Sequence, residues 1–278
     1  MREFRPGSFQ ILPTIIKNLL IINVLVFIAQ QTVEHSSNPH LMDDLFALHT
    51  WQSPLFKPWQ FVTHLFMHGN LGHIFSNMFA LWMFGSVLEN LWGPKKFLTF
   101  YIVCGLGAAF LHMVVLYFET NTLLESFNAL KQNFTYNDFQ NFYASHHIAE
   151  NYPDSNIGEI VSQWKNNPNS SQAAQQAYIL TNEYVNAQLN EATIGASGAV
   201  FGCLAAFGYL FPNTYIYIYF FLPLKAKWFV IIYAGFELTM ALQNSAGDNV
   251  AHFAHLGGAI FGLALVYFWN KTNRRTLY

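Results

Sequence analysis

Charged residues are scarce in this chain, and their scarcity sets the class of protein. Of its 278 residues, 10% are charged and 53% are hydrophobic, whereas a soluble domain carries about 25% charged residues. The net charge is −2 and no basic cluster occurs, so we expect no nucleic-acid partner. The shortage of charge places most of the chain in membrane lipid.

Cysteine is also rare, and a leader sequence is not expected. The two cysteines, Cys104 and Cys203, both lie in apolar stretches. We expect reduced thiols packed between helices, and two cysteines alone build neither a disulfide framework nor a metal site. We expect no signal peptide, because the first apolar run is too long and no small-residue cleavage site follows it.

Apolar length predicts an all-α membrane protein, a compact bundle of six transmembrane helices with an extracytoplasmic insertion. The predicted spans cover 13–32, 70–91, 97–118, 194–211, 228–242 and 250–269. Residues 214–224 are apolar but too short to span and contain Pro223, which favours an interfacial loop. Most of the 13 basic residues fall at the chain ends or after spans two and four. With six spans these positions share one side, which predicts cytoplasmic termini.

One polar segment interrupts the pattern and divides the chain into three parts. Residues 119–193 are rich in Asn, Gln and Ser and are too long for a connecting loop. We interpret them as an extracytoplasmic insertion between residues 1–118, with spans one to three, and residues 194–278, with spans four to six. A helix is expected over 171–191, with Tyr178, Ile179, Tyr184 and Leu189 as its apolar positions.

Polar residues recur at the same end of three spans. In the predicted topology spans two, four and six all begin outside, and near those ends lie His73 with Asn77, Ser197, and His255. A serine and a histidine at one depth suggest a nucleophile and its general base inside the bilayer. His73 and Asn77 are four residues apart, so both point one way and suit an oxyanion. Interhelical hydrogen bonding is the alternative for that pair.

Glycines beside the serine and the histidine predict that spans four and six approach closely. Gly198 and Gly202 are four residues apart, as are Gly258 and Gly262. Small residues at this spacing let membrane helices pack together, and helix packing alone is the alternative reading of both motifs. Phe201 lies one turn after Ser197 on the same face, where it either stacks on the His255 ring or fills the core.

Several further histidines leave a metal site open as an alternative. His64, His68 and His252 join His73 and His255, but no His-Glu-x-x-His motif is present. The acids available within the spans are Glu89 and Glu237. His252 precedes His255 by one turn, so spacing alone does not assign the base. Gly258 and Gly262 follow His255, which favours His255 over His252 as the general base. We expect no metal at these histidines.

At these residues the chain resembles the rhomboid family of intramembrane serine proteases, over all six spans in order. The resemblance rests on His73-x-x-x-Asn77, Gly195-x-Ser197-Gly198 and Ala254-His255-x-x-Gly258-x-x-x-Gly262. It implies a Ser197–His255 dyad without a third acid, and an oxyanion hole formed by His73, Asn77 and the Ser197 backbone N–H. It also implies transmembrane protein substrates cut near the outer face, with no metal or cofactor.

The chain departs from the family pattern at three places. Gln60 follows Trp59 where arginine is common, which puts the anchoring of the first outside loop in question. Phe201 stands where tyrosine is common, and residues 119–193 are foreign to the compact bacterial form. Six spans without a transit peptide or an extra span predict a bacterial inner-membrane protein with its active site opening to the periplasm.

Two other functions compete with proteolysis. A catalytically silent relative would use the same groove to bind transmembrane helices in membrane-protein quality control. Such relatives are expected to lack the serine or the histidine, and this chain keeps both. A small transporter is disfavoured because no span is broken at mid-depth with paired charges.

Overall fold

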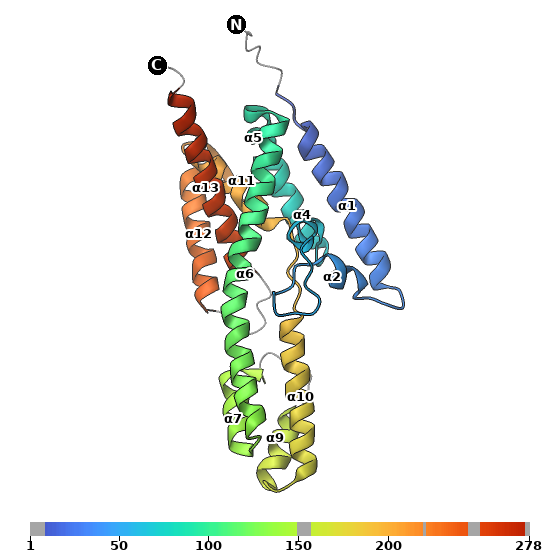
Figure 1. The fold of residues 1–278 in the computed structure, drawn as a ribbon. Helices are drawn as coiled ribbons and strands as arrows, with labels where there is room; N and C mark the ends of the chain where they lie inside the picture. The colour runs from blue at the N-terminus through green and yellow to red at the C-terminus, as the bar shows by residue number, and fades with distance from the viewer. Residues whose placement is uncertain (1–8, 149–156, 219–220, 244–250, 276–278) are drawn as a thin grey trace.

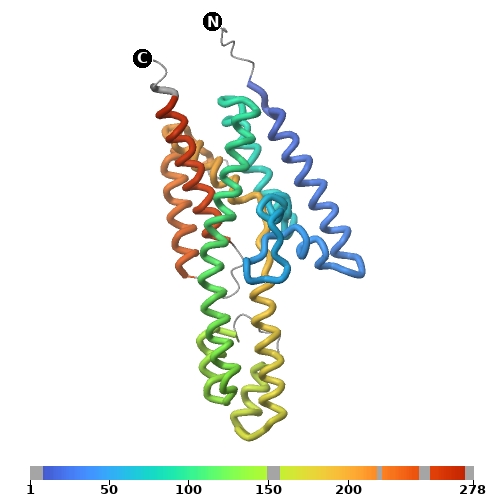
Figure 2. Tube along the Cα trace, in the orientation of Figure 1, coloured from blue at the N-terminus to red at the C-terminus, as the bar shows by residue number. Residues whose placement is uncertain are grey.

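The computed structural model describes residues 9–148, 157–218, 221–243 and 251–275 (Figure 1, Figure 2). The first half contains α1 (Thr14–Glu34), α2 (Leu41–Phe46), α3 (Gln60–Thr63), the 3₁₀ turn η1 (His64–Phe66), α4 (Leu71–Ala80), the π-helical turn η2 (Leu81–Gly85), α5 (Ser86–Trp92) and α6 (Pro94–Gln132). The second half contains α7 (Tyr136–Ser145), α9 (Ile157–Asn166), α10 (Ser171–Leu189), α11 (Ser197–Leu210), β1 (Tyr215–Ile218), β2 (Leu222–Lys225), α12 (Ala226–Gln243) and α13 (His252–Arg275).

All six apolar segments predicted from the sequence coincide with helices. Within the described residues, four helical stretches are long and apolar enough to cross a membrane: Thr14–Glu34, Leu71–Trp92, Pro94–Gln132 and His252–Thr272. The other two predicted spans are the shorter α11 and α12, with 14 and 18 residues. Large apolar side chains such as Leu25 on α1 and Ile232 on α12 are exposed, as a lipid-facing surface requires. The protein is an all-α membrane protein.

The segment expected to be an interfacial loop is instead an antiparallel hairpin. Strands β1 and β2 pair in a register that sets Tyr215 opposite Lys225 and Tyr217 opposite Pro223. Pro223 has no backbone N–H to donate, and an edge position in a two-stranded ribbon tolerates that loss. The hairpin connects α11 to α12.

The core of the bundle forms where α6, α11 and α13 pack together. On the other flank, the backbone N–H groups of Ile15 and Ile16 each donate to a carboxylate oxygen of Glu89 at 2.9 Å. These two N–H groups belong to the first turn of α1, where backbone N–H groups have no acceptor within their own helix. Glu89 therefore caps α1 from span two.

Helix α6 joins the bundle to the polar segment without a break (Figure 1). Its 39 residues extend about 58 Å at 1.5 Å per residue, well beyond a hydrocarbon core of about 30 Å. The expected boundary between residues 118 and 119 therefore falls inside a helix. The far half of α6 packs with α7, α9 and α10 around a second apolar core that includes Leu123, Phe127 and Trp164.

The expected helix over 171–191 matches α10, but its buried face differs from the one predicted. Tyr184 is buried, whereas Tyr178 and Ile179 are exposed. The other buried positions are the smaller residues Ala173, Ala177, Thr181 and Val185. Small side chains at four-residue spacing let neighbouring helices approach closely, a signal that a search for large apolar residues misses.

The ends of the bundle are distinct in Figure 1 and Figure 2. Helix α1 begins and α13 ends at the same end of the molecule, and α7, α9 and α10 form the opposite end. From α10 the chain returns to the bundle through residues 190–196 and enters α11 at Ser197. Ser197 therefore lies at the end of α11 that faces the polar segment.

Candidate active site

Ser197 and His255 lie side by side although they are far apart in the sequence. Ser197 is the first residue of α11, and His255 lies one turn inside α13. Oγ of Ser197 is 2.8 Å from Nε2 of His255, and His255 is 8% exposed. This hydroxyl–imidazole contact is the geometry that lets a histidine accept the proton of a serine nucleophile.

Glycines allow the backbones of α11 and α13 to touch beside this pair. A Cβ atom on Gly258 would overlap the carbonyl oxygen of Gly198, and one on Gly262 would lie 2.8 Å from the carbonyl oxygen of Gly202. Gly198 also meets α6, because its Cβ would overlap that of Ala108. The glycine pairs thus lie at the contact between α11 and α13, and any side chain there would push the helices apart.

The loop before Ser197 is fixed to the first half of the chain. Thr193 and Leu48 exchange two backbone hydrogen bonds of 2.8 and 2.9 Å, and the N–H of Gly195 donates to the carbonyl of His64 at 2.9 Å. Gly195 has a φ of +129°, a conformation that other residues adopt only with strain. This bend turns the chain from the loop into the first turn of α11.

Phe201 covers one face of the His255 ring. The two rings are stacked, with centroids 4.2 Å apart and planes within 5° of each other. Tyr233 of α12 packs against Phe201 at 4.9 Å. The imidazole is therefore covered by Phe201 of α11, which stands where the family commonly has a tyrosine, and Tyr233 of α12 packs behind Phe201.

Glu237 contacts the histidine that the sequence marked as the base. Its Oε2 atom is 2.9 Å from Nδ1 of His255 and 2.6 Å from Nδ1 of His252, and Glu237 is 3% exposed. The resemblance implied a dyad without a third acid, but the structure puts a carboxylate on the far nitrogen of His255. The sequence signal for this contact is an acid within an apolar span, which on sequence alone is a candidate metal ligand.

His73 lies next to the loop before Ser197. A Cβ on Gly195 would be 2.9 Å from Nε2 of His73 and 3.5 Å from Oγ of Ser197, so both atoms lie close to one point. Asn77 is 6% exposed, and its Nδ2 has no hydrogen-bond partner within the described part of the chain. Helices α4 and α11 are in contact. An unpaired buried amide donor is costly unless something else accepts from it.

The other three histidines that the sequence offers as metal ligands lie in the loop before α4, as His64 and His68, and on α13, as His252. Nδ1 of His64 lies 2.7 Å from the Gln60 carbonyl, and the His68 ring packs edge-on against His73. Burial lowers the pKa of His64 and of His68 to about 4, so both are neutral at physiological pH. Among the described residues, one group of three has ligand atoms within 4.8 Å of one another: Glu237, His252 and His255.

Gln60 anchors the first outside loop in place of the arginine common in the family. It is fully buried, and its Oε1 accepts from the backbone N–H groups of His49 and Lys57 at 3.4 and 3.0 Å. Its Nε2 donates to the carbonyls of Asp44 and Leu55 at 3.2 and 3.0 Å. One amide thus bridges four points of the loop, so the substitution keeps the loop anchored by different bonds.

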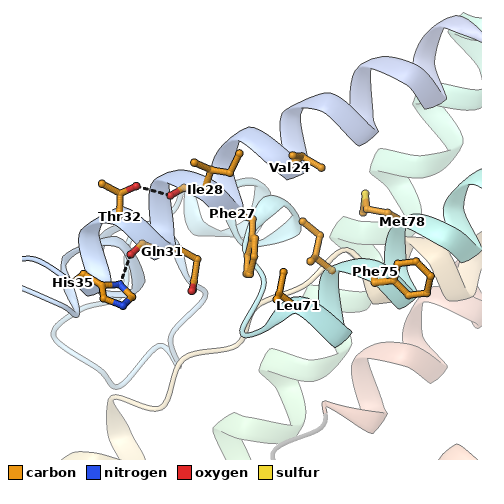
Figure 3. A pocket seen from close by; sticks show the side chains of 10 residues that line it. Val24, Phe27, Ile28, Gln31, Thr32, His35, Leu71, Phe75 and Met78 are labelled. Carbon is orange, nitrogen blue, oxygen red and sulfur yellow. Dashed lines mark hydrogen bonds between the residues drawn. The ribbon is translucent and has the colours of Figure 1, made fainter.

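A groove of about 730 Å³ lies apart from the Ser197–His255 pair, between α1 and α4 (Figure 3). Apolar side chains line most of it, including Phe27, Leu71 and Phe75. At one end, Oγ1 of Thr32 donates to the carbonyl of Ile28, and His35 Nδ1 lies 2.7 Å from the Gln31 carbonyl. The groove offers apolar surface and no nucleophile.

Comparison with known proteins places the chain in a family. A model of the Rhomboid domain matches residues 55–123 and 159–271, which is more than half of the chain. The chain therefore belongs to the rhomboid family. Residues 124–158, outside the match, lie within the polar segment.

Similar curated proteins are organellar. The chain is 27% identical over 223 residues to an uncharacterised mitochondrial rhomboid protein of Schizosaccharomyces pombe, covering 79% of this chain and 53% of that protein. It is 24% identical over 200 residues to the mitochondrial RHOMBOID-like protein 12 of Arabidopsis thaliana, covering 71% and 42%. It is 30% identical over 99 residues to the chloroplastic Rhomboid-like protein 11 of the same plant, covering 35% and 32%. The chain spans about half or less of the length of these relatives.

The expectation of a bacterial inner membrane is wrong. The curated relatives are mitochondrial or chloroplastic, which points to a eukaryotic organellar membrane. Apolar length and basic residues report how many spans a chain has and which ends share a side. They carry no information about which membrane holds the bundle.

Proposed function

We propose that this chain is an intramembrane serine endopeptidase that hydrolyses peptide bonds in or near transmembrane helices of other membrane proteins. The observation that carries the proposal is the 2.8 Å contact between Ser197 Oγ and His255 Nε2. Membership of the rhomboid family supports it at the level of protease-like function. The glycine contact between α11 and α13 supports it as well, because it holds the two side chains at a reactive distance.

The proposed reaction begins with acylation of the serine. Ser197 Oγ attacks the scissile carbonyl carbon while its proton passes to Nε2 of His255. The oxyanion accepts hydrogen bonds from the Ser197 backbone N–H, which is free at the first turn of α11, and from the side chains of His73 and Asn77. The C–N bond then breaks, and His255 returns the proton to the leaving amine.

Hydrolysis of the acyl-enzyme completes the cycle. A water molecule gives a proton to His255 and attacks the ester carbonyl, and the ester C–O bond breaks as Ser197 recovers its proton. The mechanism needs water at the end of α11 that faces the polar segment, and it uses no metal or cofactor. We place the protein in an organellar membrane, mitochondrial by preference, because the two relatives that cover most of this chain carry that designation.

The test compares the wild-type chain with Ser197→Ala in lipid nanodiscs. The wild type should cleave a model transmembrane substrate and be labelled by a fluorophosphonate probe. Ser197→Ala should do neither while keeping its thermal stability, because a single hydroxyl is removed at the start of a helix. A wild type that binds transmembrane peptides but neither cleaves them nor reacts with the probe would be the catalytically silent helix binder.

A further inference from the structure

We propose that Glu237 is the positioning residue for His255, which makes the site a Ser197–His255–Glu237 triad. This inference rests on the proposed function and deepens it. The three groups form one chain of contacts: Ser197 Oγ to His255 Nε2 at 2.8 Å, and His255 Nδ1 to Glu237 Oε2 at 2.9 Å. They come from α11, α13 and α12 respectively.

The contact selects the tautomer of His255 that a general base needs. An ionised carboxylate only accepts hydrogen bonds, so at 2.9 Å from Glu237 it is Nδ1 of His255 that carries the proton. The neutral ring then has its lone pair on Nε2, directed at the Ser197 hydroxyl. Without an acceptor at Nδ1, the ring would be free to adopt the opposite tautomer, which cannot take the serine proton.

The carboxylate also stabilises the charge that forms during the reaction. When His255 accepts the proton it becomes a buried cation, and the negative charge of Glu237 lies against it. Glu237 does not need to receive that proton; its charge and its position are sufficient. A fixed charge stabilises a developing opposite charge more strongly in a buried site than in water.

His252 holds the same carboxylate from the other side. Its Nδ1 lies 2.6 Å from the Oε2 atom that also contacts His255. A buried carboxylate is tolerated only when it is well hydrogen-bonded, and two imidazole N–H groups on one oxygen provide that. The sequence left open which of His252 and His255 is the base. In the triad His255 is the base, and His252 restrains the acid.

Helix α12 supplies both the carboxylate and the ring that packs behind Phe201, and it does so from one face. Tyr233 and Glu237 are four residues apart, so they project from the same side of the helix. Tyr233 packs on Phe201, which stacks on His255, while Glu237 bonds the edge of the same imidazole. The imidazole is therefore restrained over its face by Phe201 of α11, with Tyr233 behind it, and at its Nδ1 edge by Glu237 of α12.

The distances in this cluster favour hydrogen bonds over a metal. Two ligands at about 2.0–2.1 Å from a tetrahedral ion lie about 3.3 Å apart. The Oε2–Nδ1 distances of 2.6 and 2.9 Å are shorter than that and fall in the range of hydrogen bonds to a charged acceptor. A metal bound here would have to spread the three ligands.

The experiment measures kcat and KM for Glu237→Gln in the full chain in nanodiscs. Glutamine has the size of glutamate but lacks its charge and no longer fixes the tautomer. We expect kcat to fall by about 10²-fold, the lower end of what a general base contributes, with KM unchanged and fluorophosphonate labelling slowed in parallel. Glu237→Asp restores the charge at a longer distance and should recover part of kcat relative to glutamine.

Glu89→Gln is the matched control. Glu89 is as buried as Glu237, at 3% exposure, but it caps α1 and does not contact the histidines. It should lose thermal stability and keep kcat. If Glu89→Gln and Glu237→Gln lose kcat equally, the loss is structural and the inference is wrong. Should Glu237→Gln fail to fold, Glu237→Ala decides, because it has neither the charge nor a hydrogen-bond acceptor: wild-type kcat in that variant refutes positioning.

Three further outcomes separate the two proposals. Wild-type kcat in Glu237→Gln, alongside an inactive Ser197→Ala, would leave the protease in place and refute the triad. Stoichiometric zinc in the purified wild type, removed together with activity by EDTA, would make the cluster a metal site and refute the triad too. A wild type that neither cleaves nor reacts with fluorophosphonate would overturn the proposed function, and the triad with it.

Discussion

Gly258→Ala is expected to inactivate the protein by separating Ser197 from His255. The new Cβ would overlap the carbonyl oxygen of Gly198, at the closest contact between α11 and α13. This neighbour is backbone, so no side-chain rotation relieves the overlap and the helices themselves must move. Gly258 lies three residues after His255, so the displacement falls within one helical turn of His255.

The size of the effect follows from the contact. Relieving the overlap requires a movement of about 1 Å, and in enzymes a misplacement of that size costs about 10²-fold in rate. The Ser197–His255 distance of 2.8 Å would then exceed the range of a hydrogen bond. Overpacking of this kind also costs about 1–3 kcal/mol of stability. Activity and stability should therefore fall together.

Two other glycines make the test quantitative. Gly262→Ala meets the Gly202 carbonyl at 2.8 Å, a milder clash one turn further along, whereas a Cβ on Gly235 of α12 has nothing within 4 Å. The loss of activity and stability should be largest for Gly258→Ala and smaller for Gly262→Ala. Gly235→Ala should match wild type. Cleavage of a transmembrane substrate reports activity. A thiol-reactive dye reports unfolding, because Cys104 and Cys203 are fully buried. Wild-type activity and melting temperature in Gly258→Ala would refute the reasoning.

Two further predictions concern groups around the pair. His73→Ala and Asn77→Ala should each lower kcat by about 10²–10³-fold, as loss of one oxyanion donor does elsewhere, and a rise confined to KM would show that they hold substrate instead. Gln60→Ala should lower the melting temperature, because it leaves the buried N–H of His49, the partly buried N–H of Lys57 and two carbonyls of the loop without their Gln60 partner. An unchanged melting temperature would show that the loop is anchored elsewhere.

Much of the bundle follows from local sequence signals. Apolar length locates the six helices, and glycines at four-residue spacing locate the contact between α11 and α13. These signals work because lipid demands apolar surface and because glycine alone permits backbone contact. The shared end of spans four and six predicted Ser197 and His255 as a pair, and the structure places Ser197 Oγ 2.8 Å from His255 Nε2.

Other features depend on packing that no local pattern encodes. Glu237 and His255 belong to different helices, so their contact appears only once α12 lies against α13. In the sequence, Glu89 is likewise only a charge inside an apolar span. Its contact with the start of α1 appears only in the folded chain. The hairpin of β1 and β2 reads as a loop because its strands have four residues each, too few for a clear alternating pattern.

Helix α6 runs without a break from the bundle into the polar segment, so it connects the two physically. Ala108 of α6 packs against Gly198, next to Ser197, and Leu130 of the same helix lies in the core shared with α7, α9 and α10. Ala108 and Leu130 are separated by about 33 Å along the helix axis. A tilt of α6 by about 5° about Ala108 would therefore displace Leu130 by about 3 Å. A displacement of the polar end would therefore reach Gly198 through one continuous helix.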